Sequence, residues 1–143
     1  MATTRSTVQS VLDRYVQAVK ASDADALLAL YSDDVHVYDL MEPFERHGNA
    51  SQRELMEAWL NEEGVEQDCV IEDVNIMQDG DLAVARASVR YSATKPGDEQ
   101  EWMWNRATWA LRRETGEWKI IHEHTSVPLS APDMQPIYDG RGT

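Results

Sequence analysis

The side chain best placed for chemistry is the carboxylate of Asp39, because of the residues that precede it. Val35, Val37 and Asp39 alternate along a short strand-like run, so all three face the same side. A carboxylate that continues an apolar row is suited to proton transfer, since burial favours its neutral form. The alternative is a solvated carboxylate that ends the strand or caps the next loop. Asp39 is therefore the first candidate for a general acid or base.

Aromatic side chains on predicted helices are the next candidates. Tyr15 lies on the apolar stripe of the first helix, and Tyr31 falls at the end of the second. A phenol in such a position either polarises a ligand oxygen or packs in the core with its hydroxyl bonded to a backbone carbonyl. Trp59, on the third helix, either forms the aromatic wall of a pocket or only packs between helices.

Other reactive side chains predict neither a metal nor a cofactor. His122 and His124 alternate on one strand face, but a zinc site needs three or four converging ligands, and His36 and His47 have no predicted place beside them. Cys69, the only cysteine, lies in an apolar run and is expected to be a buried, inert thiol. The sequence contains no glycine-rich phosphate loop and no serine-centred elbow.

Three helices are predicted in the first half of the chain. The first is predicted from an apolar stripe at helical spacing, made by Val8, Val11, Leu12, Tyr15, Val16 and Val19. The second is capped by Ser22 or Asp23 and carries apolar residues through Tyr31. The third begins at the capping-box sequence SQRE, residues 51–54, and ends at Gly64.

Four strand-like runs follow, at about residues 68–77, 82–92, 100–113 and 118–127, with turn sequences between them. Short connections make neighbouring strands antiparallel. Helices followed by such a meander predict an α+β domain over residues 1–129, in which helices cover one face of a curved sheet and enclose an apolar cavity. Residues 130–143 contain two of the last three prolines and are expected to form an extended C-terminal tail.

The net charge of the chain limits the kinds of molecule that it is expected to bind. Twenty-six acidic residues against thirteen Lys and Arg give a formal charge of −13, which repels nucleic acid and anionic membranes. The beginning of the chain lacks the apolar run of a signal peptide, and no run is long enough to cross a bilayer. We therefore expect a cytoplasmic protein whose partner is a small molecule.

Four segments of the chain resemble a known family. These are YVQAV (15–19), SDADAL (22–27), LYSDDV (30–35) and GEWKIIHEHTS (116–126). They are similar to the SnoaL-like and ketosteroid isomerase-like proteins of the nuclear transport factor 2-like superfamily, over nearly the whole chain. The resemblance implies a cone-shaped barrel, made of a strongly curved antiparallel sheet packed on three N-terminal helices. It does not specify a reaction, because this superfamily contains many different activities as well as non-catalytic binders.

The resemblance also assigns roles to individual residues. Asp39 falls where ketosteroid isomerases keep a general base, and Tyr15 where a tyrosine donates a hydrogen bond to the developing oxyanion. The chain departs from this pattern near Ala107, where the family's second acid is missing, and Asn105 is the candidate neutral donor. Glu123 is expected to face the pocket as a second acid, unless it lies exposed on a frayed strand.

The resulting predictions are a site and a partner surface. Asp39 and Tyr15 are the predicted catalytic residues, without a metal or cofactor. The predicted substrate-binding residues are Tyr31, Trp59, Tyr91, Asn105, Trp109 and Glu123. The family habit implies a homodimer through the outer sheet face, with Trp102, Trp104, His122 and His124 in the interface.

Two functions remain open at this point. One is a cofactor-independent enzyme of isomerase, cyclase or dehydratase type that moves protons within an apolar substrate. The other is a non-catalytic domain that binds a small ligand or mediates dimerisation.

Overall fold

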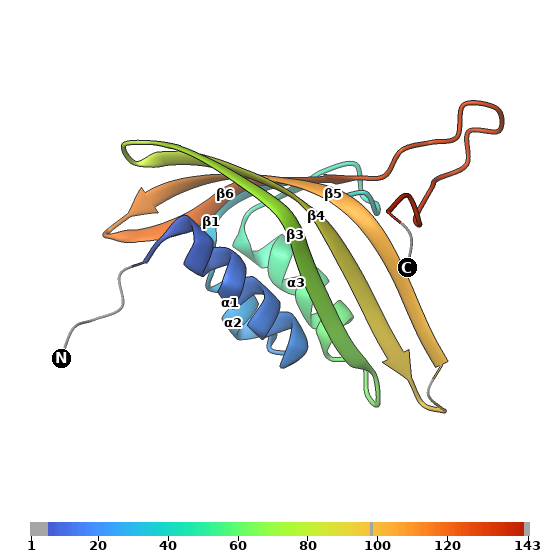
Figure 1. Ribbon diagram of the computed structural model, residues 1–143. Coiled ribbons are helices and arrows are strands. Elements are labelled where there is room, and N and C mark those ends of the chain that lie inside the picture. Colours follow the sequence, from blue (N-terminus) through green and yellow to red (C-terminus); the bar gives the residue numbers. More distant parts are fainter. Residues whose placement is uncertain (1–5, 98, 142–143) are drawn as a thin grey trace.

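Three helices cover the concave face of a curved, mostly antiparallel sheet in the computed structural model (Figure 1). The structure describes residues 6–97 and 99–141. Its elements are α1 (Val8–Lys20), α2 (Ala24–Leu28), β1 (Tyr31–Tyr38), β2 (Arg46–His47), α3 (Asn49–Leu60), β3 (Glu66–Asp79), β4 (Leu82–Lys95), β5 (Glu99–Glu114) and β6 (Glu117–Ser126). The predicted α+β class and architecture are confirmed.

Helix α1 forms where the apolar stripe predicted it. Thr7 caps its first turn, because the Thr7 hydroxyl accepts a hydrogen bond from the Ser10 amide and the Ser10 hydroxyl accepts one from the Thr7 amide. The stripe, including Val11, Leu12 and Tyr15, is buried against the sheet. This contact aims the Tyr15 hydroxyl toward the interior of the cone.

The second helix is shorter than predicted. Helix α2 ends at Leu28, and Tyr31 is the first residue of β1 rather than the last residue of a helix. The reason is tertiary: the Ile120 amide of β6 donates to the Leu30 carbonyl, and Tyr31 pairs with Ile120. Local helix propensity is overridden by this pairing.

The capping-box prediction for the third helix was wrong. Helix α3 begins at Asn49, so Ser51 lies inside its first turn, and the N-cap is Gly48 with φ +90°. An L side chain rarely adopts this conformation, whereas glycine does so readily. The Gly48 amide also donates to the Val35 carbonyl at 2.8 Å, which ties the start of the helix to β1.

The sheet order is β2-β1-β6-β5-β4-β3. Strands β3 to β6 form the predicted antiparallel meander, whereas β1 runs parallel to β6. In this parallel pair Val37 lies beside Glu123 and Tyr38 beside His124. The first strand and the last strand of the chain are therefore neighbours, and their ends carry both candidate acids.

A β-bulge in β6 changes which residues face inward. Ala110 pairs with His122 and Leu111 with Ile120, so Ile121 is an extra residue without its own partner on β5. Trp118 and Ile120 are consequently buried in the core, although strict alternation along β6 would put them on the same face as His122. Beyond the bulge, Glu123 faces inward as expected.

The C-terminal arm, residues 127–141, folds back on itself instead of running straight (Figure 1). The Ile137 amide donates to the Pro128 carbonyl at 2.9 Å, and the Tyr138 carbonyl accepts from the Trp104 amide of β5 at 2.8 Å. Within the described part of the chain, no helix is both long enough and apolar enough to cross a membrane.

Candidate functional site

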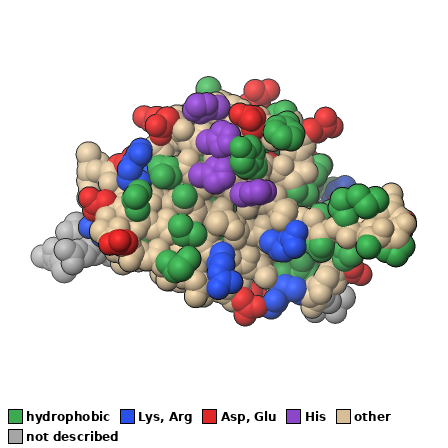
Figure 2. All heavy atoms as spheres, turned by 90° about the horizontal axis from the view of Figure 1, so that it is seen from above, with side chains coloured by type: hydrophobic (Ala, Val, Ile, Leu, Met, Phe, Trp, Pro, Cys, Tyr) green, Lys and Arg blue, Asp and Glu red, His purple; other side chains and the backbone are tan. Residues whose placement is uncertain are grey.

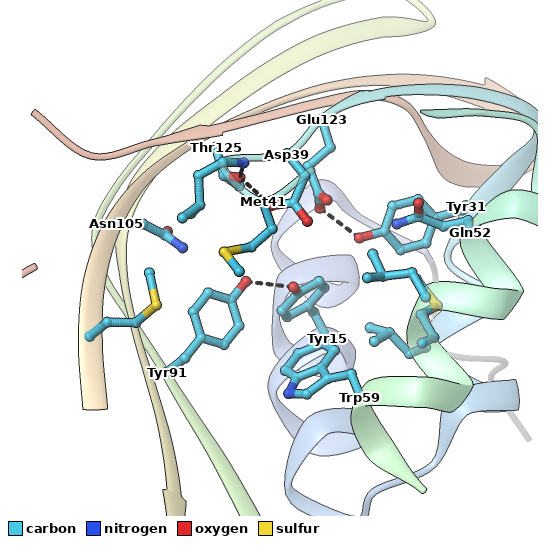
Figure 3. A pocket seen from close by; sticks show the side chains of 15 residues that line it. Tyr15, Tyr31, Asp39, Met41, Gln52, Trp59, Tyr91, Asn105, Glu123 and Thr125 are labelled. Atoms are coloured by element: carbon cyan, nitrogen blue, oxygen red, sulfur yellow. Dashed lines mark hydrogen bonds between the residues drawn. The ribbon is translucent and has the colours of Figure 1, made fainter. Parts of the chain in front are cut away.

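A cavity of about 310 Å³ lies between the helices and the concave face of the sheet (Figure 3). Its volume is at the lower end of the range for small-molecule sites. Of the predicted site residues, the cavity lining includes Tyr15, Tyr31, Asp39, Trp59, Tyr91, Asn105 and Glu123. The structure therefore brings together residues from α1, α3 and four regions of the sheet.

Glu123 is a buried carboxyl group held by two donors. Only 7% of the residue is exposed. The Tyr31 hydroxyl donates to Glu123 Oε1 at 2.6 Å, and the Trp109 indole N–H donates to the same oxygen at 2.8 Å. Burial raises the pKa of Glu123, while the two hydrogen bonds lower it and the nearby charge of Asp39 raises it. Burial prevails, so the neutral acid is favoured more than in a solvated glutamate.

Asp39 directly follows β1 and lines the same cavity, partly exposed. The Thr125 hydroxyl donates to Asp39 Oδ1 at 3.0 Å and accepts from the Leu40 amide, also at 3.0 Å. Thr125 thus fixes both the carboxylate and the backbone that follows it. Figure 3 shows the Asp39 and Glu123 carboxyl groups side by side at one end of the cavity.

Tyr15 and Tyr91 form a hydroxyl pair, with 2.6 Å between their oxygens. Burial, followed by the neighbouring ionisable groups, raises the pKa of Tyr15 well above its ordinary value. Burial likewise raises the pKa of Tyr91. Both phenols therefore remain protonated. One hydroxyl donates to the other, and the acceptor keeps its own proton for a third group.

Two buried amides complete the polar lining. Gln52 is 1% exposed and Asn105 is 5% exposed, and the carbonyl oxygen of each lacks a hydrogen-bond partner among the described residues. Buried polar groups are normally bonded, so a bound ligand or water is expected to satisfy them. Asn105 lines the cavity, and its role there as a neutral donor remains a prediction.

The two predicted tryptophans have different positions. Trp59 lines the cavity, packs edge-on against Tyr91 with ring centroids 5.5 Å apart, and donates to Gln67 at 3.3 Å. Trp109 lies behind the cavity surface and is fully buried, where it contacts Tyr15 and holds Glu123. It is therefore a positioning residue for the acid rather than part of the cavity lining.

Sequence reasoning missed two polar residues of the lining, Gln52 and Thr125, besides several apolar ones. Gln52 is buried on the same helix face as Met56 and Leu60, and a polar residue at i, i+4, i+8 spacing in an apolar stripe could have been noticed. Thr125 shares strand parity with Glu123, but its bond to Asp39 depends on the parallel pairing of β1 and β6.

The electrostatics of the cavity are one-sided. Among the described residues that line it, two carry carboxyl groups and none is Lys, Arg or His. Among all the residues that the structure describes, no three His, Cys, Asp or Glu side chains are grouped so as to hold a metal ion. Cys69 of β3 is buried, and burial raises the pKa of its thiol to about 12.

Histidines gather on the outer face of the sheet beside exposed apolar side chains (Figure 2). His36 stacks on His122 with ring centroids 5.1 Å apart, and Tyr38 contacts both His122 and His124. Desolvation lowers the pKa of His122. Trp104, predicted for the dimer interface, is only 9% exposed, because Arg141 of the C-terminal arm lies over its ring.

Comparison with known proteins agrees with this geometry. The SnoaL-like domain family matches residues 8–130. An NTF2-like protein of unknown function from Pseudomonas putida KT2440 is 25% identical and superposes with a TM-score of 0.80 over 92% of each chain. No curated protein is similar enough in sequence to be counted as a relative.

Two more distant structures share the fold. A ketosteroid isomerase-like protein from Erwinia carotovora atroseptica SCRI1043 is 20% identical, with a TM-score of 0.67 over 83% of this chain and 92% of that one. A provisionally assigned scytalone dehydratase from Novosphingobium aromaticivorans DSM 12444 is 14% identical, with a TM-score of 0.76 over 95% and 93%. The chain belongs to the SnoaL-like domain family, and its fold is that of the nuclear transport factor 2-like superfamily.

Proposed function

We propose that the protein is a cofactor-independent acid/base enzyme that moves protons within an uncharged, largely apolar cyclic substrate. The observation that carries this proposal is the pair of carboxyl groups, Asp39 and Glu123, in one cavity whose described lining contains no basic residue. A carboxylate or phosphate on the ligand would be buried beside these acids without a counter-ion, so an anionic substrate is disfavoured.

The environments of the two acids divide their roles. Asp39 is partly exposed and accepts from Thr125, which suits a general base. Glu123 is buried with a raised pKa, which suits a general acid. Because Tyr31 and Trp109 both occupy Oε1, Oε2 is the oxygen that carries the transferable proton.

The Tyr15–Tyr91 hydroxyl pair supplies a third catalytic role, that of a hydrogen-bond donor. The Tyr15–Tyr91 pair retains one hydroxyl proton that can polarise a carbonyl or hydroxyl of the substrate. The names of the two distant structures, an isomerase-like protein and a dehydratase, describe proton transfer of this kind and support the same class of reaction.

The test is exchange of carbon-bound protons in a bicyclic ketone, 2-tetralone, dissolved in D₂O and followed by proton NMR. The natural chain should accelerate exchange, and Asp39→Asn should lose roughly 10²-fold or more of that acceleration, the usual contribution of a general base. The control is Asp79→Asn, an exposed acid at the end of β3. Exchange at the natural rate in Asp39→Asn would contradict the assignment.

A non-catalytic ligand-binding domain is the second candidate. In its favour, Tyr31 already bonds to Glu123, Thr125 to Asp39, and Tyr15 to Tyr91. The carbonyl oxygens of Gln52 and Asn105 are the lining atoms left without a partner among the described residues. This function predicts that 2-tetralone binds without accelerated exchange and that its affinity is unchanged in Asp39→Asn. Calorimetry on the same two proteins separates the two candidates.

A further inference from the structure

A second hollow, the outer chamber, adjoins the cavity and has a volume of about 550 Å³. Four residues line both spaces: Met41, Trp59, Tyr91 and Met103. The two spaces are therefore neighbours, with these four side chains at their boundary. The outer chamber is the more open of the two and lies toward solvent.

The outer wall of this chamber comes from β5 and from the C-terminal arm. Trp102 forms part of it, with the Arg90 guanidinium 5.0 Å from its ring centre. Tyr138 of the arm also lines the chamber and is 42% exposed.

The arm is held against the sheet, so Tyr138 is a fixed wall. The Tyr138 carbonyl accepts from the Trp104 amide at 2.8 Å. Three residues later, Arg141 lies over the Trp104 ring at 5.2 Å and pairs with Asp73 at 2.7 Å. A segment anchored at Tyr138 and again at Arg141 loses little further entropy when a ligand contacts it.

The chemistry of the outer chamber differs from that of the cavity. Its described lining is mostly aromatic and aliphatic, and its one carboxylate, Glu101, pairs with Lys95 at 3.1 Å. The cavity, by contrast, holds two carboxyl groups, and two amides whose carbonyl oxygens have no partner among the described residues. The polar groups that could fix a reacting ring are therefore in the inner space, and the outer space offers apolar contact.

We propose that the site takes an elongated, uncharged ligand, whose polar ring occupies the cavity and whose apolar extension lies in the outer chamber between Trp102 and Tyr138. This inference rests on the proposed function only for the location of the ring. It makes Trp102 and Tyr138 specificity-determining residues that select for the length of the extension, and it gives the C-terminal arm a role in ligand selection.

The test is calorimetric binding of 4-alkylphenols, from 4-methylphenol to 4-hexylphenol. Each methylene that becomes buried should lower the Kd of the natural chain by up to about fourfold. Tyr138→Ala should flatten this dependence on chain length and leave the Kd of 4-methylphenol within about twofold. Trp102→Ala should act in the same direction.

The control is Met134→Ala, a residue of the same arm that is 64% exposed and does not line the outer chamber. It should retain the dependence on chain length of the natural chain. An unchanged dependence in both Tyr138→Ala and Trp102→Ala would overturn the proposal, as would the failure of every member of the series to bind. Because binding is measured and turnover is not, a failed proton-exchange test leaves this result standing.

Discussion

At the scale of single residues, the buried acid Glu123 is the most informative side chain of the cavity. Its carboxyl group is enclosed by the side chains of Tyr31 and Trp109, both donating to one oxygen. Buried carboxyl groups are costly unless they are bonded or neutral, and this one is both bonded and displaced toward its neutral form. Two measurements separate these effects.

The first prediction concerns pH. Because the pKa of Glu123 is raised by folding, the folded state holds the proton more tightly. The stability from this group is complete below the unfolded pKa of about 4.3 and is lost as pH rises through the folded pKa. Relative to the natural chain, Glu123→Gln should therefore gain free energy of unfolding between pH 4 and pH 8, by about 1.4 kcal/mol for each unit of pKa shift.

Urea unfolding at both pH values measures this difference. The exposed Glu66→Gln serves as the control and should differ from the natural chain equally at pH 4 and pH 8. A Glu123→Gln variant whose relative stability falls with rising pH would show that the carboxylate, not the acid, is favoured by folding.

The second prediction concerns Trp109 as a positioning residue. Trp109→Phe removes the indole N–H from Glu123 and keeps most of the ring, so we expect a loss of about 1–3 kcal/mol, the cost of a buried group that loses a partner. It should also raise the pKa of Glu123 further, because this hydrogen bond lowers it. Trp118→Phe, an equally buried tryptophan beneath Arg113, should leave the pH dependence of stability unchanged.

At the scale of elements, alternation and turn sequences predicted the four long strands to within three residues at each end. They could not predict the features that depend on pairing between strands far apart in the sequence. Tyr31 leaves its helix because β6 pairs with it, and β2 is two residues long and forms only against His36 and Val37. Counting alternate residues also failed at Trp118 and Ile120, since a bulge is visible only when the partner strand is known.

The same limit applies to the site. The inward direction of Asp39 followed from its own strand, whereas its bond to Thr125 depends on a strand 86 residues later in the chain. The predicted proximity of Tyr15 to the site was correct, but its hydroxyl partner is Tyr91. Trp109 was predicted to bind substrate; its indole bonds to Glu123, and it is not among the described residues that line the cavity.

The third prediction tests the bulge. Deletion of Ile121 makes His122 follow Ile120 directly, so regular alternation keeps both Ile120 and Glu123 on the inward face of β6 without a bulge. We expect a loss of less than about 3 kcal/mol in the free energy of unfolding, because no core residue and no buried acid has to turn outward. Ile121→Val keeps the bulge and should cost about 1 kcal/mol. A loss of more than about 3 kcal/mol on deletion of Ile121, measured in urea, would show that the core needs the bulge itself.

At the scale of the whole molecule, the homodimer through the outer sheet face remains a prediction. The arm covers Trp104, so the surface that can receive a second copy centres on His122, His124 and Tyr38. In a two-fold interface both copies carry the same substitution. His124→Glu would therefore place two like charges near each other. We expect the natural chain to sediment as a dimer and His124→Glu as a monomer.

The exposed Met77→Glu on β3 is the control for this fourth prediction and should remain dimeric. A monomeric natural chain, or a dimer that persists in His124→Glu, would place any interface elsewhere.

The parallel pairing of β1 with β6 has a consequence for synthesis of the chain. Asp39 emerges early from the ribosome, but Glu123 and Thr125 follow more than eighty residues later. At about 5–20 residues per second, the nascent polypeptide spends several seconds with its apolar concave surface uncovered on one side. This interval, set by topology alone, is when the growing chain is most exposed to chaperones and to aggregation.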